Sequence, residues 1–247
     1  MKNLICLIIV ACGASLATAQ TKVEKVVPVK AGENIKMEFK WPELITIKTW
    51  ERNEVKLLAS VEINKGQNDE AFTFDVDQSS SGVIIESLIK NFKKLPRKIL
   101  IKKGDQEYFF NTDDMNSPEI KKFKKEHGED SYEYTSHGVV MDINLEVWIP
   151  TNCTLDVYSK FGLVEVIGFQ GDMKIHSKFG GVDVSTSGKE AIMAGTKFGE
   201  KYTNIEGSIE TISLGDHPGD WDWVKVGNGS KSQEVKSDFG NVYLRKL

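Results

Sequence analysis

The clearest recognition chemistry in this sequence is a pair of tryptophans, Trp221 and Trp223, in the segment His217–Trp223. Two residues apart on a strand, these side chains face the same side, with Asp220 and Asp222 on the other. Exposed aromatic rings stack on sugars and mark recognition sites. Trp221 and Trp223 are therefore candidate ligand-binding residues. The alternative is that they cover a degenerate repeat at Leu214.

Residues suited to catalysis or metal binding are scattered along the chain. The four histidines, at positions 127, 137, 176 and 217, lack the spacing of metal ligands. Asp113-Asp114 is not followed by a calcium-loop pattern. Cys153 is the only cysteine after the first twelve residues, which leaves no internal disulfide framework, and we expect it to be buried in a strand. We expect no catalytic residue, no metal and no cofactor.

The N-terminal residues have the design of a secretory signal peptide. Lys2 precedes the apolar run Leu4–Val10, and Ala17-Thr18-Ala19 forms a small-residue cleavage site. The run is too short to span a bilayer as a helix. We predict a signal peptide over 1–19 and a mature chain that begins at Gln20. In the alternative, Cys12 is acylated and anchors a lipoprotein. Either way the protein works in the periplasm, at the cell surface or as a secreted protein.

The composition limits the partners. A net charge of -4 is too small and of the wrong sign for a general nucleic-acid binder. With 40% apolar and 28% charged residues, the chain is neither disordered nor a membrane bundle.

A tetrapeptide recurs in the C-terminal part. Its copies begin at Ser159, Ser177, Thr196 and Ser237, and they read Ser-Lys-Phe-Gly, Ser-Lys-Phe-Gly, Thr-Lys-Phe-Gly and Ser-Asp-Phe-Gly. A degenerate copy, Ser213-Leu214-Gly215, lies before the last one. The flanks repeat as well, because the positions six and four residues before Phe, and three and five after it, are mostly apolar. In the third copy, Tyr202 and Ile205 suggest a slip of about one residue in this alignment.

Two strands that meet at a glycine bend about every 19 residues predict the rung of a right-handed β-solenoid. We expect the glycine to permit a corner or bulge. The phenylalanines would form an interior ladder, with Phe161 and Phe198 in the rungs beside Phe179. The alternative is an antiparallel sandwich.

Outward positions of these rungs carry charge. One column contains Lys160, Lys178, Lys197 and Asp238, and another contains Glu165, Asp183, Tyr202 and Tyr243. Some β-solenoids are polysaccharide lyases or hydrolases, which need clustered or paired carboxylates. Acids do not stack in phase here, so we interpret these columns as surface charge pairing.

The run Asn144–Pro150, then Leu155-Asp156-Val157 and the Lys-Phe-Gly repeats, resembles a domain family of exported bacterial β-strand-repeat proteins labelled "putative adhesin", of unknown function. Ile45–Trp50 resembles the first strands of that family. The resemblance implies a β-solenoid and a cell-envelope location, and it offers no catalytic residues.

The remaining chain divides into an N-terminal β region over 20–87, a charged insert over 88–137 and the repeats over 138–247. In the first region we expect a hairpin joining Val27–Val29 to Ile35–Phe39, a pair formed by Ile45–Ile47 and Val55–Ile63, and a hairpin around 78–82. The insert has a basic half and an acidic half that are expected to pair with each other. Ser117 is expected to cap a helix that has Pro118 in its first turn and runs through Glu126.

These observations predict a non-catalytic, exported envelope or surface protein, an adhesin-like scaffold for an unidentified glycan or protein partner. A β-solenoid polysaccharide lyase or hydrolase is the alternative. Contact with a membrane is expected only if Cys12 is lipidated.

Overall fold

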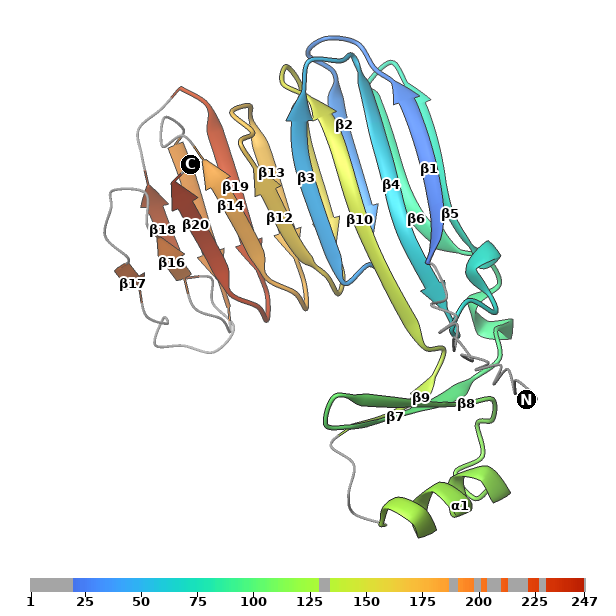
Figure 1. The fold of residues 1–247 in the computed structure, drawn as a ribbon. Coiled ribbons are helices and arrows are strands. Elements are labelled where there is room, and N and C mark those ends of the chain that lie inside the picture. Colours follow the sequence, from blue (N-terminus) through green and yellow to red (C-terminus); the bar gives the residue numbers. More distant parts are fainter. Residues whose placement is uncertain are drawn as a thin grey trace, which may run out of the picture.

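The computed structural model describes residues 20–128, 134–186, 191–197, 201–203, 210–212, 222–226 and 230–246. This part of the chain is mostly β-strand with one short α-helix, so the all-β expectation is confirmed (Figure 1). The predicted signal peptide over 1–19, including Cys12, lies outside the described residues. In the described part, no helix combines the length and apolarity needed to cross a membrane.

Two large sheets form the main body. In spatial order, the nine-stranded sheet contains β1 (Thr21–Pro28), β4 (Glu54–Ile63), β10 (Met141–Pro150), β3 (Leu44–Trp50), β12 (Leu163–Ile167), β14 (Val182–Thr186), β20 (Val242–Lys246), β16 (Lys201–Thr203) and β17 (Glu210–Ile212). The eight-stranded sheet contains β18 (Asp222–Val226), β15 (Ala191–Thr196), β19 (Ser232–Ser237), β13 (Met173–Ser177), β11 (Thr154–Ser159), β2 (Asn34–Phe39), β6 (Gly82–Ile89) and β5 (Phe72–Ser79).

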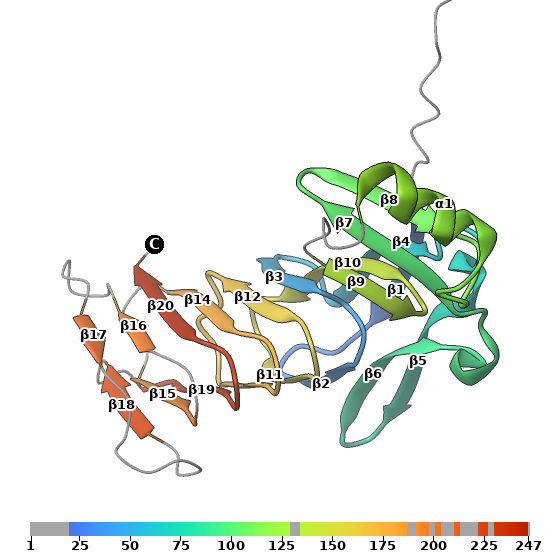
Figure 2. The same ribbon diagram turned by 90° about the horizontal axis from the view of Figure 1, so that it is seen from below.

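The tetrapeptide copies correspond to strand pairs that cross from one sheet to the other. We name them repeat 1 (β11–β12), repeat 2 (β13–β14), repeat 3 (β15–β16) and repeat 4 (β19–β20). In each repeat the first strand lies in the eight-stranded sheet and the second in the nine-stranded sheet (Figure 2). Equivalent positions pair in parallel, as in Leu155 with Met173 and Val164 with Val182. The alignment of the repeats is therefore confirmed in these strands.

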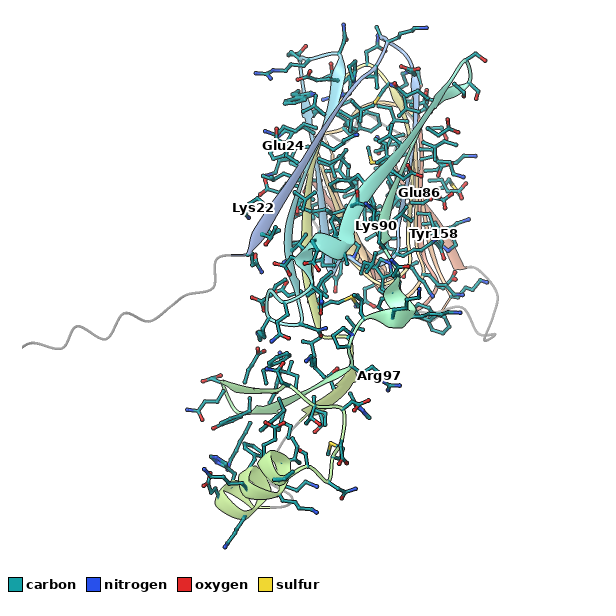
Figure 3. The ribbon with its side chains drawn as sticks, turned by 90° about the vertical axis from the view of Figure 1, so that its right-hand side faces the viewer. Lys22, Glu24, Glu86, Lys90, Arg97 and Tyr158 are labelled. Carbon is teal, nitrogen blue, oxygen red and sulfur yellow. The ribbon has the colours of Figure 1, made fainter. Side chains whose placement is uncertain are left out.

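The core lies between the two sheets. In repeats 1, 2 and 4, the side chains six and four residues before Phe, and three and five after it, point inward and are buried, as in Leu155, Val157, Val164 and Val166. Figure 3 looks along the stack of strands, with Lys22 and Glu24 outside one sheet and Glu86 and Tyr158 outside the other. Stacking therefore buries a face that a single repeat leaves open.

The spatial order of the repeats differs from their sequence order. β19 pairs in parallel with both β13 and β15, and β20 pairs in parallel with both β14 and β16. Repeat 4 thus lies between repeats 2 and 3. Lys201 pairs with Val242, so the slip expected in the third copy is absent. The degenerate copy at 213–215 lies outside the described residues, and β17 and β18, which flank it, pair antiparallel to β16 and β15.

The N-terminal strands extend the same stack. β2 pairs in parallel with β11, and β3 pairs in parallel with β12, so β2–β3 forms a further repeat. The hairpin expected between 27–29 and 35–39 is wrong, because β1 and β2 lie in different sheets. The direct pairing of 45–47 with 55–63 is also wrong, because β10 lies between β3 and β4. Alternation of apolar and polar residues predicts which face of a strand is buried, but it does not predict which strand pairs with it. The β5–β6 hairpin is confirmed.

A small inserted module follows β6. It contains β7 (Lys98–Lys103), β8 (Gln106–Phe110), α1 (Pro118–His127) and β9 (Tyr134–Gly138), and its strands form a separate sheet in the order β8-β7-β9. The cap on α1 is confirmed, because the Ser117 hydroxyl accepts the Ile120 N–H at 3.4 Å. The module has its own buried cluster, formed by Ile99, Ile101, Ile120 and Phe123.

The module is attached at both ends to one buried side chain. The Asn64 amide nitrogen donates to the Pro96 carbonyl at 3.0 Å, and its amide oxygen accepts the Val140 N–H at 3.0 Å. Two short 3-10 turns, Asp69–Ala71 and Phe92–Lys94, complete the elements of this region. The range 88–137 expected for the excursion includes the end of β6, where Ile89 is buried in the main core.

Candidate binding surface

The tetrapeptides of repeats 1, 2 and 4 form the corner between their two strands. The Ser237 hydroxyl accepts the Gly240 N–H at 2.7 Å, and the Ser159 hydroxyl accepts the Gly162 N–H at 3.2 Å. Serine and glycine thus hold the first and fourth positions of a turn, which both residue types favour. The two residues between them, Lys and Phe in repeats 1 and 2 and Asp and Phe in repeat 4, occupy the tip of the corner.

This geometry overturns the interior phenylalanine ladder. Phe161, Phe179 and Phe239 are 46%, 45% and 51% exposed, whereas Ser159, Ser177 and Ser237 are buried. The serine is the last inward residue of its strand, and the turn then directs Phe outward. Phe179 has Phe161 and Phe239 as neighbours, and Phe198 lies outside the described residues.

The corner glycines are required by close backbone contact. A Cβ on Gly180 would lie 2.1 Å from the Gly162 carbonyl oxygen, and one on Gly240 would lie 2.2 Å from that of Gly180. The backbone at these glycines is not left-handed. Their role is therefore to let successive corners stack, rather than to permit an unusual turn.

The exposed rings continue into a longer column. Trp41, from the β2–β3 corner, lies 6.4 Å from Phe161 and 4.4 Å from Phe92 between ring centroids. Phe161 and Phe179 stack at 5.5 Å, and Phe179 and Phe239 at 5.2 Å, with 17° between the planes in both pairs. We call Phe92, Trp41, Phe161, Phe179 and Phe239 the aromatic column. The phenylalanine rings of the column stack face to face, so their edges point outward.

Lysines accompany these rings. The Lys160 ammonium lies 4.8 Å from the centroid of Phe161, and that of Lys178 lies 5.2 Å from the centroid of Phe179. Ring edges carry the positive end of the aromatic quadrupole. Around Phe161 and Phe179 the column therefore presents an apolar surface that is also electropositive, whereas Asp238 takes the lysine position beside Phe239.

A cavity of about 700 Å³ opens at one end of the column, between the main body and the inserted module. Trp41 and Phe161 belong to both the column and the cavity wall. The remaining lining residues are Glu43, Glu62, Lys65, Leu100, Lys102, Glu107, Ser136, Val139, Val140, Met141 and Asp142. This volume is in the range of small-ligand sites. Column and cavity form one continuous candidate surface.

Ion pairs hold the charged wall of this cavity. Glu107 contacts Lys102 at 2.7 Å and Lys65 at 3.1 Å, and Lys65 also contacts Glu62 at 3.0 Å. The hydrogen bond from Lys102 lowers the pKa of Glu107. Glu43 remains accessible to solvent, yet desolvation on its cavity side, followed by the charge of Asp142, raises its pKa. The wall offers carboxylate acceptors and ammonium donors to a polar ligand.

The other candidate residues from the sequence lie elsewhere. Trp221 is outside the described residues, and Trp223 lies in β18, opposite Gly195 of β15. Glu165 accepts the Thr46 hydroxyl at 3.0 Å. Asp183 pairs with Arg245 at 2.8 Å, and burial raises its pKa. The charge pairing expected for this outward column is therefore seen for Asp183, whereas Glu165 bonds to a neutral hydroxyl.

Two further predicted residues have structural roles in this region. The His176 ring nitrogen lies 3.2 Å from a carboxylate oxygen of Asp238 on the neighbouring repeat. Cys153 is buried, as expected, but it lies in the turn between β10 and β11 and not in a strand. Its thiol donates to the Pro150 carbonyl, and burial raises its pKa to about 12. In the described ranges, no three His, Cys, Asp or Glu side chains lie close enough together to hold a metal ion.

Sequence reasoning missed the part played by Trp41 and Phe92. The signal for Trp41 was present, because Ile35, Met37, Ile45 and Ile47 match the inward pattern of the repeats. Phe39 replaces the corner serine and Pro42 the glycine, and the pairing shows one extra residue before β3. These differences hide the copy from a search for the tetrapeptide.

Comparisons with known proteins add little. No family model matches the chain, and no curated protein matches it. A "putative cell adhesion protein" from Clostridium sporogenes aligns with a TM-score of 0.46 and 10% identity, over 92% of this chain and 100% of that one. A "putative adhesin" from Bacteroides fragilis aligns with a TM-score of 0.22 and 9% identity, over 93% of this chain and 99% of that one.

Proposed function

We propose that the protein is a non-catalytic, exported surface or cell-envelope protein, an adhesin-like β-solenoid that binds a glycan along its aromatic column. The observation that carries this proposal is the exposure of Phe161, Phe179 and Phe239 in one contiguous stack. Contiguous exposed apolar surface marks interaction sites, whereas single exposed apolar residues are ordinary. Export rests on the signal-peptide pattern over 1–19.

The corner backbone favours a glycan over a peptide strand. The N–H groups of Phe179 and Phe239 donate to the carbonyls of Lys160 and Lys178 on the preceding corner in the stack. A peptide that binds by strand addition needs free backbone groups, and these are already used. A glycan with a repeating unit would instead contact one ring edge and one neighbouring side chain in each repeat of the column.

The charge of the column favours an acidic glycan. Lys160 and Lys178 lie over the rings, and the ring edges attract electron-rich oxygen atoms. Carboxylate groups of a uronic-acid polymer would match both features. The interaction is exposed, so added salt should weaken it.

The test is binding of the chain 20–247 to immobilised polygalacturonate and to a neutral glucan. We expect retention on the acidic polymer, and loss of retention when Phe161, Phe179 and Phe239 are all changed to Ser. The matched control changes Val26 and Ile84, which are exposed hydrophobic residues on other elements, to Ser. Equal retention of the two variants would contradict the column as the site. New reducing or unsaturated ends in the bound polymer would contradict a non-catalytic role and favour a lyase or hydrolase.

A further inference from the structure

The outer face of the eight-stranded sheet carries a row of residues in a regular order. Six neighbouring strands, β6, β2, β11, β13, β19 and β15, pair in parallel, and each places one residue in this row. Across the sheet, the row contains Ile84, Lys36, Asp156, Lys174, Glu234 and Met193. An apolar residue thus lies at each end, and the four charges between them alternate in sign. With about 4.8 Å between strands, the row is about 24 Å long.

The row is open to solvent. Its apolar ends, Ile84 and Met193, are 38% and 37% exposed. Its other four residues line, together with Ile84, a hollow of about 480 Å³ on the outside of the sheet. The face is therefore accessible to another molecule along its whole length.

The charges at the centre of the row are not used within the chain. The ion pairs at its outer charges run along single strands: Lys36 with Glu38 at 2.8 Å, and Glu234 with Lys236 at 3.3 Å. Asp156 and Lys174 lie opposite each other on β11 and β13, yet neither forms an ion pair with a residue of the described ranges. Two opposite charges thus remain available at the middle of the face.

The order of the row is self-complementary. A two-fold axis that runs parallel to the strands, between β11 and β13, places the row of a second copy opposite this one in reversed order. The facing pairs are then Ile84 with Met193, Lys36 with Glu234, and Asp156 with Lys174. Each charge meets an opposite charge, and each apolar end meets an apolar end.

The next outward row of the same strands follows the same rule. Two residues further along each strand, it contains Glu86, Glu38, Tyr158, His176, Lys236 and Gly195. Glu86 and Tyr158 are seen outside the sheet in Figure 3. About the same axis, Glu38 faces Lys236, the Tyr158 ring faces the His176 ring, and Glu86 faces the uncharged Gly195. One axis therefore matches both rows without placing like charges together.

We propose that this face is an interface between two copies of the chain, which pack their eight-stranded sheets face to face about the axis between β11 and β13. Two aligned sheets about 10 Å apart let the side chains of both faces interdigitate. Exposed ion pairs contribute little each, and complementary charge mainly selects the partner. We therefore expect a dimer of modest affinity that added salt weakens.

This interface is separate from the glycan site and goes beyond it. The corner lysines, Lys160 and Lys178, lie over the rings of the aromatic column, at the ends of the strands and outside the two matched rows. The dimer therefore does not depend on the column, and its test uses the protein without a glycan.

The test uses two single charge reversals in the chain 20–247. Asp156→Lys places a lysine opposite Lys174 of the second copy, and Lys174→Asp places an aspartate opposite Asp156. Because like charges across an interface are costly, each variant alone should self-associate at least about tenfold more weakly than the parent. Mixed in equal amounts, the two variants restore opposite charges at both central contacts and should form a heterodimer. Sedimentation equilibrium gives the dissociation constant in each case.

A double variant with both reversals in one chain keeps the net charge and restores the facing pairs, so it should dimerise like the parent. Glu24→Lys is the matched control, because it makes the same charge change outside the other sheet, and it should leave the dissociation constant unchanged (Figure 3). Denaturant melts establish that each variant is folded. A parent that stays monomeric at the highest soluble concentration would overturn the proposal. Single variants that associate as strongly as the parent, or a mixture that associates no more strongly than its components, would overturn it as well.

Discussion

The Ser237 hydroxyl oxygen lies 2.7 Å from the Gly180 carbonyl oxygen and donates a hydrogen bond to it across the boundary between two repeats. The same hydroxyl accepts the Gly240 N–H of its own corner. One buried side chain thus fixes the turn within a repeat and the stacking between repeats.

Ser237→Ala should therefore destabilise the fold. The change leaves a buried carbonyl and a buried N–H without this partner, which costs about 1–3 kcal/mol. Denaturant melts of the chain 20–247 measure the free energy of unfolding. Lys236→Ala, at the adjacent outward position, is the control and should stay within about 0.5 kcal/mol of the parent. Equal losses for the two variants would contradict the role of the serine.

Gly180→Ala tests the close stacking of the corners. The new Cβ would lie 2.1 Å from the Gly162 carbonyl oxygen, and backbone cannot move away as a flexible side chain can. We expect a loss of about 3 kcal/mol or more in the free energy of unfolding, or failure to fold. Gly138→Ala, where a Cβ meets nothing within 4 Å, should be nearly neutral. A Gly180→Ala variant as stable as the Gly138→Ala variant would rule out the stacking explanation.

Phe179→Ala and Ile175→Ala separate the outer column from the core. Ile175 is 1% exposed, so its truncation leaves a cavity and should cost about 2–5 kcal/mol. Phe179 is half exposed, and its truncation should cost about 1 kcal/mol. Urea melts give both values. A larger loss for Phe179→Ala would mean that the column is the main stabilising stack.

Replacement of residues 98–138 by a short glycine linker should leave cooperative unfolding of the main body in place. Lys98 and Gly138 pair directly, so the cut ends lie side by side, and the module has its own core. Differential scanning calorimetry on the shortened chain checks this expectation. A broad, non-cooperative transition would show that the main body depends on the module.

The Cys153 thiol should resist alkylation in the folded protein. Burial raises its pKa from 9.0 to about 12, so the thiol stays protonated at mildly alkaline pH, where an exposed cysteine is partly thiolate. Intact-mass measurement after iodoacetamide treatment should show no adduct until denaturant is added. Fast labelling of the folded chain would contradict the buried position.

The inward positions of the repeats were predictable because in-register parallel stacking places each position over its equivalent. Leu155 and Met173 show this directly. The outward turn of Phe179 was not predictable from alternation, since a hydrogen-bonded corner follows the buried Ser177 and resets which side the next residues face. The order of the repeats was not predictable either. All copies of the repeat have the same pattern of inward and outward residues, so this pattern does not predict which repeat stacks on which.

The pattern also hid much of the candidate site. Trp41 lies in a corner in which Phe39 and Pro42 replace serine and glycine, and Phe92 belongs to a 3-10 turn outside the repeats. Trp41 lies beside Phe161 because β2–β3 stacks on β11–β12, and Phe92 contacts Trp41 from the turn that follows β6. Trp221, chosen from the sequence, lies outside the described residues.

The position of repeat 4 also sets the order in which the protein can assemble. A ribosome makes repeat 3 before repeat 4, and β15 presents inward residues, Ile192 and Ala194, that would also suit the edge of β13. A folding chain can therefore form a premature pairing of β15 with β13 that must open before β19 enters. Formation of the native stack waits for contacts between residues far apart in sequence, which slows folding. Entry of this one strand pair between repeats 2 and 3 is therefore the step that completes both large sheets.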